Sequence, residues 1–113
     1  MQYGRGIMET VNEDTDIYYY ALRSIPPALE AAGRATIAAY GLRARLFHFE
    51  FFVLPDGGAL ALEVNMRPPG GLTTDMFNYS NDMDIYREWA NVVTGRPFSA
   101  AASRPYHCCY AGR

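Results

Sequence analysis

The clearest pattern of hydrophobic and polar positions lies in the middle of the chain, where two apolar runs flank a short polar segment. The first run spans residues 46–54, the second spans 59–66, and Pro-Asp-Gly-Gly at 55–58 separates them. Aromatic and branched side chains favour strands, whereas proline, aspartate and glycine favour turns. The pattern therefore predicts a β-hairpin with a four-residue turn.

Helical patterns occur on both sides of this hairpin. Residues 27–40 carry apolar or small side chains at spacings of three and four, which predicts a helix with one buried stripe. Pro27 suits the first turn of this helix, and Gly41 suits its C-terminal cap. The stripe would consist of Leu29, Ala32, Thr36, Ala39 and Tyr40. A second helix is expected over 85–94, with Asp84 as its N-cap.

The remaining segments carry weaker patterns. Residues 17–22 predict a short aromatic strand, and a last strand is expected near 106–110. Residues 1–16 are polar and acidic, so we expect a flexible loop or a frayed terminus there. Residues 72–83 read as an irregular segment. The prediction is a single α+β domain over 17–113, built on an antiparallel sheet with a central hairpin and flanking helices.

The turn determines the register of the hairpin. A four-residue turn pairs Leu54 with Ala59. Antiparallel pairing then places Glu50 directly opposite Glu63. The other members of this polar face are His48, Phe52, Asn65 and Arg67. The opposite face would carry Phe47, Phe49, Phe51, Val53, Leu60, Leu62, Val64 and Met66. Because that second face is entirely hydrocarbon, we expect it to form the core and to receive both helices.

The polar face brings two like charges together. Glutamates directly opposite each other have Cβ atoms about 5 Å apart, and their repulsion is destabilising. A divalent cation between them reverses the sign of the interaction, and carboxylate and amide oxygens are ligands that Mg²⁺ prefers. Glu50, Glu63 and Asn65 are therefore candidate metal ligands, and Arg67 could bind phosphate oxygens. The alternative is a solvated acidic face, with His48 as a half-buried sheet residue that suits Mg²⁺ poorly.

Composition and charge limit the classes of partner. A net charge of -2 gives no reason to expect nucleic acid, and no segment approaches the roughly 20 apolar residues of a membrane span. Residues 1–10 lack the apolar run of a signal peptide, so a cytoplasmic location is expected. Cys108 and Cys109 are expected to be ordinary reduced thiols. All ten basic residues are arginine, and the chain has no lysine.

At the hairpin the sequence resembles the ATP-grasp superfamily of ligases. The matching pieces are Phe49-Glu50-Phe51, the Asp56-Gly57 turn and Leu62-Glu63-Val64-Asn65-Met66-Arg67. In that family one strand supplies an acidic residue and the next strand carries Glu-x-Asn-x-Arg. The resemblance implies that Glu50, Glu63 and Asn65 hold Mg²⁺ or Mn²⁺ ions that bridge the phosphates of ATP. It also implies that Arg67 is the catalytic residue that contacts phosphate or an acyl-phosphate intermediate.

The resemblance also implies what this chain lacks. An ATP-grasp enzyme clamps its nucleotide between two α+β subdomains, and the first of them supplies lysines, a flexible glycine-rich loop and the adenine linker. None of these is recognisable here. We therefore expect a C-terminal subdomain, inactive alone, whose partners are ATP, a small carboxylate substrate and the N-terminal subdomain. The Pro-Pro-Gly-Gly run at 68–71 favours the carboxylate-amine ligase branch.

Other interpretations of the chain remain open. A non-catalytic module that reuses the fold to bind a small molecule or a protein would need neither lysine nor metal. A purely structural α+β domain would leave its acidic face in solvent. A sheet that normally packs against other domains could also associate with a second copy of itself.

Overall fold

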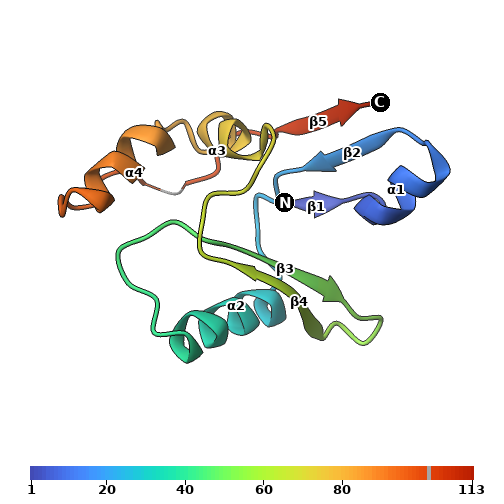
Figure 1. Cartoon of the computed structure of the whole chain (residues 1–113), viewed down its shortest axis with the longest axis horizontal. Helices are drawn as coiled ribbons and strands as arrows, with labels where there is room; N and C mark the ends of the chain where they lie inside the picture. The colour runs from blue at the N-terminus through green and yellow to red at the C-terminus, as the bar shows by residue number, and fades with distance from the viewer. Residues whose placement is uncertain (102) are drawn as a thin grey trace. The chain divides into compact units, whose positions relative to one another are not determined.

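The computed structural model describes residues 1–101 and 103–113 and has an α+β fold (Figure 1). Its strands form two antiparallel sheets, a three-stranded sheet with the order β1-β2-β5 and a two-stranded sheet of β3 and β4. The described residues group into two compact units, each with one sheet. The first unit comprises Met1–Arg23, Gly70–Ile85 and Ala100–Arg113, and the second comprises Ser24–Pro69 and Tyr86–Ser99. Residues 17–113, predicted as one domain, contribute to both units.

A row of three tyrosines crosses the sheet of the first unit. Its elements are β1 (Gln2–Tyr3), α1 (Ile7–Glu13), β2 (Ile17–Tyr20), α3 (Thr73–Asn81) and β5 (Cys109–Gly112). Tyr19 on β2 pairs with Tyr3 on β1 and with Tyr110 on β5. The ring centroids lie 5.0 Å and 4.9 Å apart, within the range for favourable aromatic pairs. The predicted aromatic strand is therefore confirmed, and it lies at the centre of this sheet.

Two segments of the first unit are more regular than their sequence patterns indicate. Residues 1–16, predicted as a loop or frayed end, contain β1 and α1. Residues 72–83, predicted as irregular, contain α3. The buried positions of α3 are mostly polar, so no apolar stripe marks this helix in the sequence. They are Thr73, Thr74, Met76, Ser80 and Asn81. Both helices end at an aspartate in the left-handed conformation, a role usually taken by glycine or asparagine.

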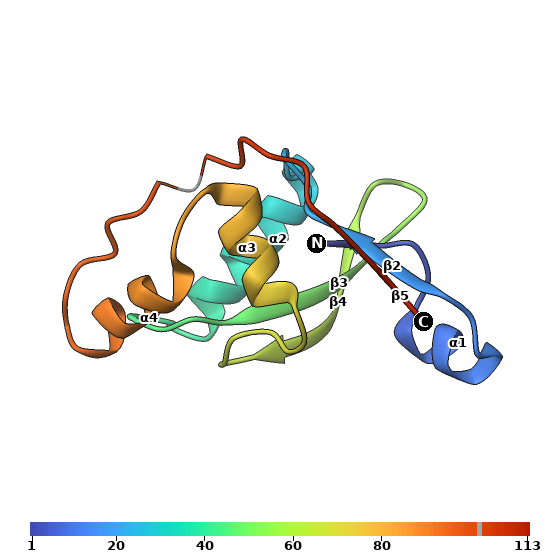
Figure 2. The same ribbon diagram turned by 90° about the horizontal axis from the view of Figure 1, so that it is seen from above.

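The second unit contains the predicted hairpin and the predicted helix that precedes it. Its elements are α2 (Pro27–Ala39), β3 (His48–Val53), β4 (Ala59–Asn65) and all but the first residue of α4 (Ile85–Val93). Helix α2 packs against both strands of the hairpin (Figure 2). Gly41 follows its end with a φ of 59°, in the left-handed region that glycine adopts without strain. The helix at 27–40 and its C-terminal glycine are thus confirmed.

The core differs from the prediction. The buried hydrophobic residues are Tyr19, Ala21, Met76 and Ile85, and all four belong to the first unit. On the hairpin, Phe49, Phe51 and Val64 are half-buried, whereas Leu60 and Leu62 are more than half exposed. In the predicted stripe of α2, Leu29, Ala32 and Thr36 are half-buried, whereas Ala39 and Tyr40 are exposed. Among the described residues, α4 makes no extensive contact with the hairpin, so the predicted packing of two helices on one apolar face is wrong.

The turn of the hairpin is one residue longer than predicted. Val53, and not Leu54, pairs with Ala59. The amide of Leu54 donates to the carbonyl of Gly58 at 2.9 Å, and the amide of Gly57 donates to the carbonyl of Leu54 at 2.9 Å. These bonds close a five-residue loop, 54–58, in place of the four-residue turn.

A bulge in β4 compensates for the longer turn. The register shifts between Glu50 and Phe51, which leaves Leu62 without a partner on β3. Phe51 pairs with Ala61, so Leu60 lies opposite Phe52, on the face of the glutamates, and its predicted place on the apolar face is wrong. Beyond the bulge the register returns to the predicted one.

No helix among the described residues combines the length and the apolar character that crossing a membrane requires.

Candidate metal centre

The hairpin places two glutamates directly opposite each other. Glu50 on β3 pairs with Glu63 on β4, as the sequence predicts. Glu50 is half-buried and Glu63 is exposed. Like charges in this position are destabilising by up to about 1 kcal/mol. Among the described residues, neither carboxylate forms an ion pair with an arginine, so no protein cation offsets the repulsion.

His48 belongs to the same cluster. One ligand atom each from His48, Glu50 and Glu63 can be chosen so that all three lie within 4.8 Å of one another. Ligands on opposite sides of an octahedral ion with bonds near 2.1 Å are about 4.2 Å apart. Small side-chain movements would therefore bring the three atoms onto one ion. The sequence prediction did not include His48 as a ligand, although its position two residues before Glu50 places it on the same face.

Asn65, the third predicted ligand, connects the other members of the cluster. It pairs with His48 in the predicted register. Its amide nitrogen, Nδ2, donates to Nε2 of His48 at 2.9 Å and also to Oε1 of Glu63. The amide nitrogen therefore points into the cluster, and Asn65 would have to turn about its χ2 angle to offer its oxygen to an ion.

A backbone carbonyl determines the tautomer of His48. Nδ1 of its ring lies 3.1 Å from the carbonyl oxygen of Arg67. A carbonyl oxygen only accepts hydrogen bonds, and the amide nitrogen of Asn65, Nδ2, only donates them. The tautomer that satisfies both contacts carries its proton on Nδ1 and leaves a lone pair on Nε2. That lone pair is directed toward Asn65.

The side chain of Arg67 lies at the end of this strand. It is exposed, and its guanidinium donates to the carbonyl of Pro68 at 3.0 Å. This bond uses one of five N–H donors, so the others can bind a phosphate. The predicted phosphate contact of Arg67 stays a prediction. The structure adds a second role, because the carbonyl of Arg67 orients the ring of His48.

A further carboxylate, which the sequence analysis did not single out, lies on α4. Glu88 has no exposed surface, and it accepts hydrogen bonds at 2.8 Å from both the amide and the hydroxyl of Ser99. The amide of Ser99, and next its hydroxyl, lower the pKa of Glu88 below that of an ordinary glutamate. These bonds tie α4 to the loop that follows it, so we assign Glu88 a structural role.

The lowered pKa of Glu88 predicts a loss of stability in acid. Glu88 has a lower pKa in the folded chain than in the unfolded chain. Its contribution to the free energy of unfolding is therefore fully present when the pH is above the pKa that Glu88 has in the unfolded chain. It is lost as the pH falls through the folded pKa. Ser99→Ala removes one of the two bonds to the ionised form, so it should raise the pKa of Glu88. Carbon-detected NMR titration of the Glu88 carboxyl measures this shift, with Ser103→Ala as the control; equal pKa values in both variants would contradict the assignment.

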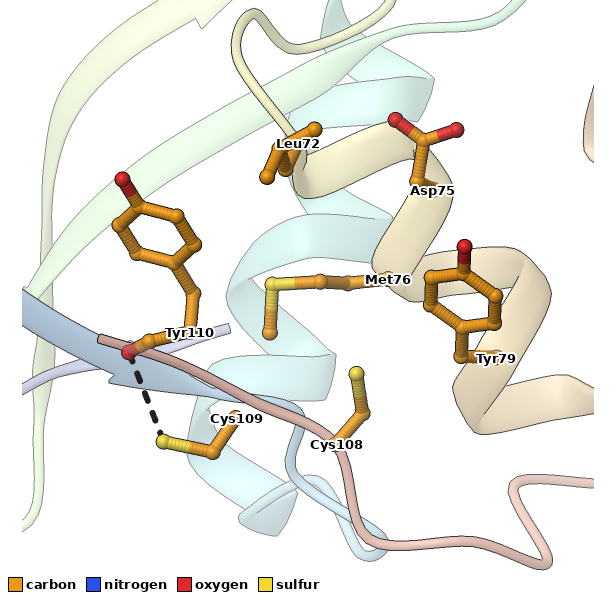
Figure 3. A pocket seen from close by; sticks show the side chains of 7 residues that line it. All are labelled: Leu72, Asp75, Met76, Tyr79, Cys108, Cys109 and Tyr110. Carbon is orange, nitrogen blue, oxygen red and sulfur yellow. Dashed lines mark hydrogen bonds between the residues drawn. The ribbon is translucent and has the colours of Figure 1, made fainter. Parts of the chain in front are cut away.

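The first unit has a separate pocket of about 180 Å³ (Figure 3). Its lining is formed by Leu72, Asp75, Met76, Tyr79, Cys108, Cys109 and Tyr110. Small-molecule sites usually measure about 300–1,000 Å³, so this pocket is too small for a nucleotide. Both cysteines are free, as predicted. Burial, and then the neighbouring Cys109, raise the pKa of Cys108, which disfavours the reactive thiolate.

Comparison of the chain with models of known protein families, with curated proteins and with solved structures gives no match. The resemblance to the ATP-grasp superfamily therefore rests on the hairpin residues alone and stays a prediction.

Proposed function

We propose that the hairpin binds a divalent cation between Glu50 and Glu63, and that this ion holds the phosphates of a nucleotide. The observation that carries the proposal is the direct pairing of the two glutamates, neither of which forms an ion pair with an arginine in the part of the chain that the structure describes. A fold that served only as scaffold would gain stability by replacing either charge. The cluster also contains Asn65, whose amide oxygen would be a further donor for the ion once the side chain turns about χ2.

In this proposal the chain is the metal- and phosphate-binding subdomain of a cytoplasmic ATP-dependent carboxylate-amine ligase. ATP would phosphorylate a small carboxylate, and an amine would displace the phosphate from the acyl phosphate. A bound Mg²⁺ or Mn²⁺ would neutralise charge on the transferred phosphate. Glu50 and Glu63 would hold the ion, Asn65 would orient toward it, and Arg67 would contact phosphate oxygens. An N-terminal subdomain would supply the lysines and the adenine site.

We expect this chain alone to hydrolyse no ATP and to bind Mg-ATP with a Kd of roughly 1 mM or weaker, corresponding to no more than about 4 kcal/mol. The reason is that Arg67 is the only proposed phosphate contact and the chain contains no lysine. The measurement is a ³¹P NMR titration of ATP with the chain, in Mg²⁺ and again in EDTA. Binding should require Mg²⁺ and should weaken in Arg67→Gln but not in the control Arg96→Gln.

Two results would count against this account of the nucleotide. Micromolar affinity would mean that the chain holds a complete site and is not half of one. Equal affinity with Mg²⁺ and with EDTA would mean that the ion plays no part in binding phosphate.

A second candidate function is a non-catalytic module that binds another protein. The turn end of the hairpin favours it, because Phe52, Val53, Leu60 and Leu62 are each more than half exposed there. Exposed apolar clusters mark many interaction surfaces. Binding of this kind would be insensitive to divalent cations and to Glu63→Gln, whereas the proposed function would be sensitive to both.

A further inference from the structure

We propose that His48 is itself a metal ligand, through Nε2, and that the site prefers Zn²⁺ to Mg²⁺. This inference rests on the proposed function, because it concerns the ion held by the same hairpin. It changes the donor set from oxygen alone to one imidazole nitrogen with two carboxylates. It also changes the class of ion from a hard alkaline-earth cation to a first-row transition-metal dication.

The ring of His48 is oriented as it is in histidines that bind metal ions. The carbonyl of Arg67, 3.1 Å from Nδ1, selects the tautomer with the proton on Nδ1. Histidines that bind metal ions almost always donate their other N–H to a carbonyl, a carboxylate or water, which orients the ring and increases the basicity of the ligating nitrogen. His48 has this arrangement, so a backbone group orients its ring and leaves the Nε2 lone pair for a ligand bond.

Lone pairs of His48 and Glu63 converge at one point of the hairpin. Nε2 of His48 and Oε1 of Glu63 both accept from the same amide group, Nδ2 of Asn65. Glu50 belongs to the same cluster, because one ligand atom from each of His48, Glu50 and Glu63 lies within 4.8 Å of the other two. A dication would satisfy these lone pairs together and would also neutralise the two carboxylates.

The chemistry of the donors selects the ion. Imidazole suits zinc, copper, iron and nickel, whereas Mg²⁺ prefers oxygen ligands and keeps several waters. Zinc sites with three protein ligands leave a fourth position open for water or substrate. His48, Glu50 and Glu63 form such a set of three. Solvent can reach this set, because Glu63 is exposed and Asn65 beside it is only half-buried. The open position would accept a phosphate oxygen.

The test uses the whole chain with Cys108→Ser and Cys109→Ser, because thiols bind Zn²⁺ and would mask the hairpin. Calorimetric titrations with Zn²⁺ alone and with Mg²⁺ alone compare His48→Gln with His107→Gln, which changes the chain's other histidine. We expect Zn²⁺ to bind at least about 100-fold more tightly than Mg²⁺. His48→Gln should weaken Zn²⁺ binding by about 100-fold or more, because removing a ligand costs at least as much as removing an outer-shell partner, which costs about 10–100-fold. Mg²⁺ binding should stay within about threefold. His107→Gln should change neither affinity.

A second readout does not depend on the folding of a variant. In the Cys-to-Ser chain with both histidines present, ¹⁵N NMR should show that Zn²⁺ shifts Nε2 of His48 and leaves Nδ1 protonated. Zn²⁺ affinity unaffected by His48→Gln, or an unshifted Nε2, would overturn the role of His48. If that happened and Glu63→Gln still weakened Mg²⁺ binding, the proposed function would stand without His48 as a ligand. Failure of both ions to bind the hairpin would overturn the inference and the proposed function together.

Discussion

Replacing Glu50 and Glu63 together by glutamine is expected to weaken the binding of Mn²⁺ to the chain by about 100-fold or more. The number of charged ligands changes the affinity of oxygen-liganded cation sites by orders of magnitude. The two carboxylates are the only negative charges in the cluster of His48, Glu50, Glu63 and Asn65. Glutamine keeps the size of each side chain and can still accept the hydrogen bond from Asn65 to position 63. Calorimetric titration of Mn²⁺ measures the change.

The same two substitutions should not destabilise the fold, although they weaken the binding of Mn²⁺. Without metal, removing the facing charges should leave the free energy of unfolding unchanged or raise it by up to about 1 kcal/mol. Urea denaturation in EDTA measures this quantity. The control is Glu9→Gln with Glu13→Gln, which makes the same change of charge on α1 and should alter Mn²⁺ binding little. A hairpin variant that binds Mn²⁺ as tightly as this control would show that the glutamates are a solvated face.

Tyr19→Ala is expected to lower the free energy of unfolding of the first unit by about 3–5 kcal/mol, as large aromatic deletions in a core do. Tyr19 is 7% exposed, and its ring contacts those of Tyr3 and Tyr110, so its removal breaks both of these ring contacts. Small domains are stable by only about 5–15 kcal/mol in total, so this loss would leave the unit close to unfolding.

The matched control for Tyr19 is its neighbour on the same strand. Tyr20 is 41% exposed, and Tyr20→Ala should cost less than about 1 kcal/mol, because surface substitutions are usually small. Urea denaturation followed by the amide NMR signals of β2 and β5 separates this sheet from the rest of the chain. Equal losses in the two variants would mean that the tyrosine row does not hold the sheet together.

Elements with a strong local pattern could be predicted from the sequence. The hairpin and α2 have periodic apolar positions, turn residues and a C-terminal glycine, and the structure confirms them. Strand β1 has two residues and exists only through its partner β2, so nothing local marks it. Helix α3 buries threonine, serine and asparagine, and α1 has no side-chain N-cap, so neither helix shows the usual signals.

The pairing of the glutamates was predicted correctly although the turn was not. The turn has one more residue than predicted, which shifts the pairing of the two strands by one position. The bulge at Leu62 adds one unpaired residue to β4 and shifts the pairing back, so Glu63 again lies opposite Glu50. Ala61 and Leu62 are both apolar, and the pattern therefore does not show which residue leaves the ladder. The consequence is local: Leu60 changes face, and the apolar face of the hairpin is smaller than expected.

For the candidate site, spacing along two strands was enough to bring Glu50, Glu63 and Asn65 together. The tautomer and ring orientation of His48 were not predictable, because they depend on the carbonyl of Arg67 beside the ring. A backbone group that selects a tautomer leaves no trace in a pattern of side chains.

The central claim is that the hairpin binds a divalent cation between its two glutamates. The most direct measurement adds Mn²⁺ at a small fraction of the protein concentration to the ¹⁵N-labelled chain and records which amide signals lose intensity. The account predicts that signals from residues 48–50 and 63–65 broaden first, because a paramagnetic ion relaxes the nuclei nearest to it. Broadening confined to the acidic residues of 9–16, or no selective broadening at all, would contradict it.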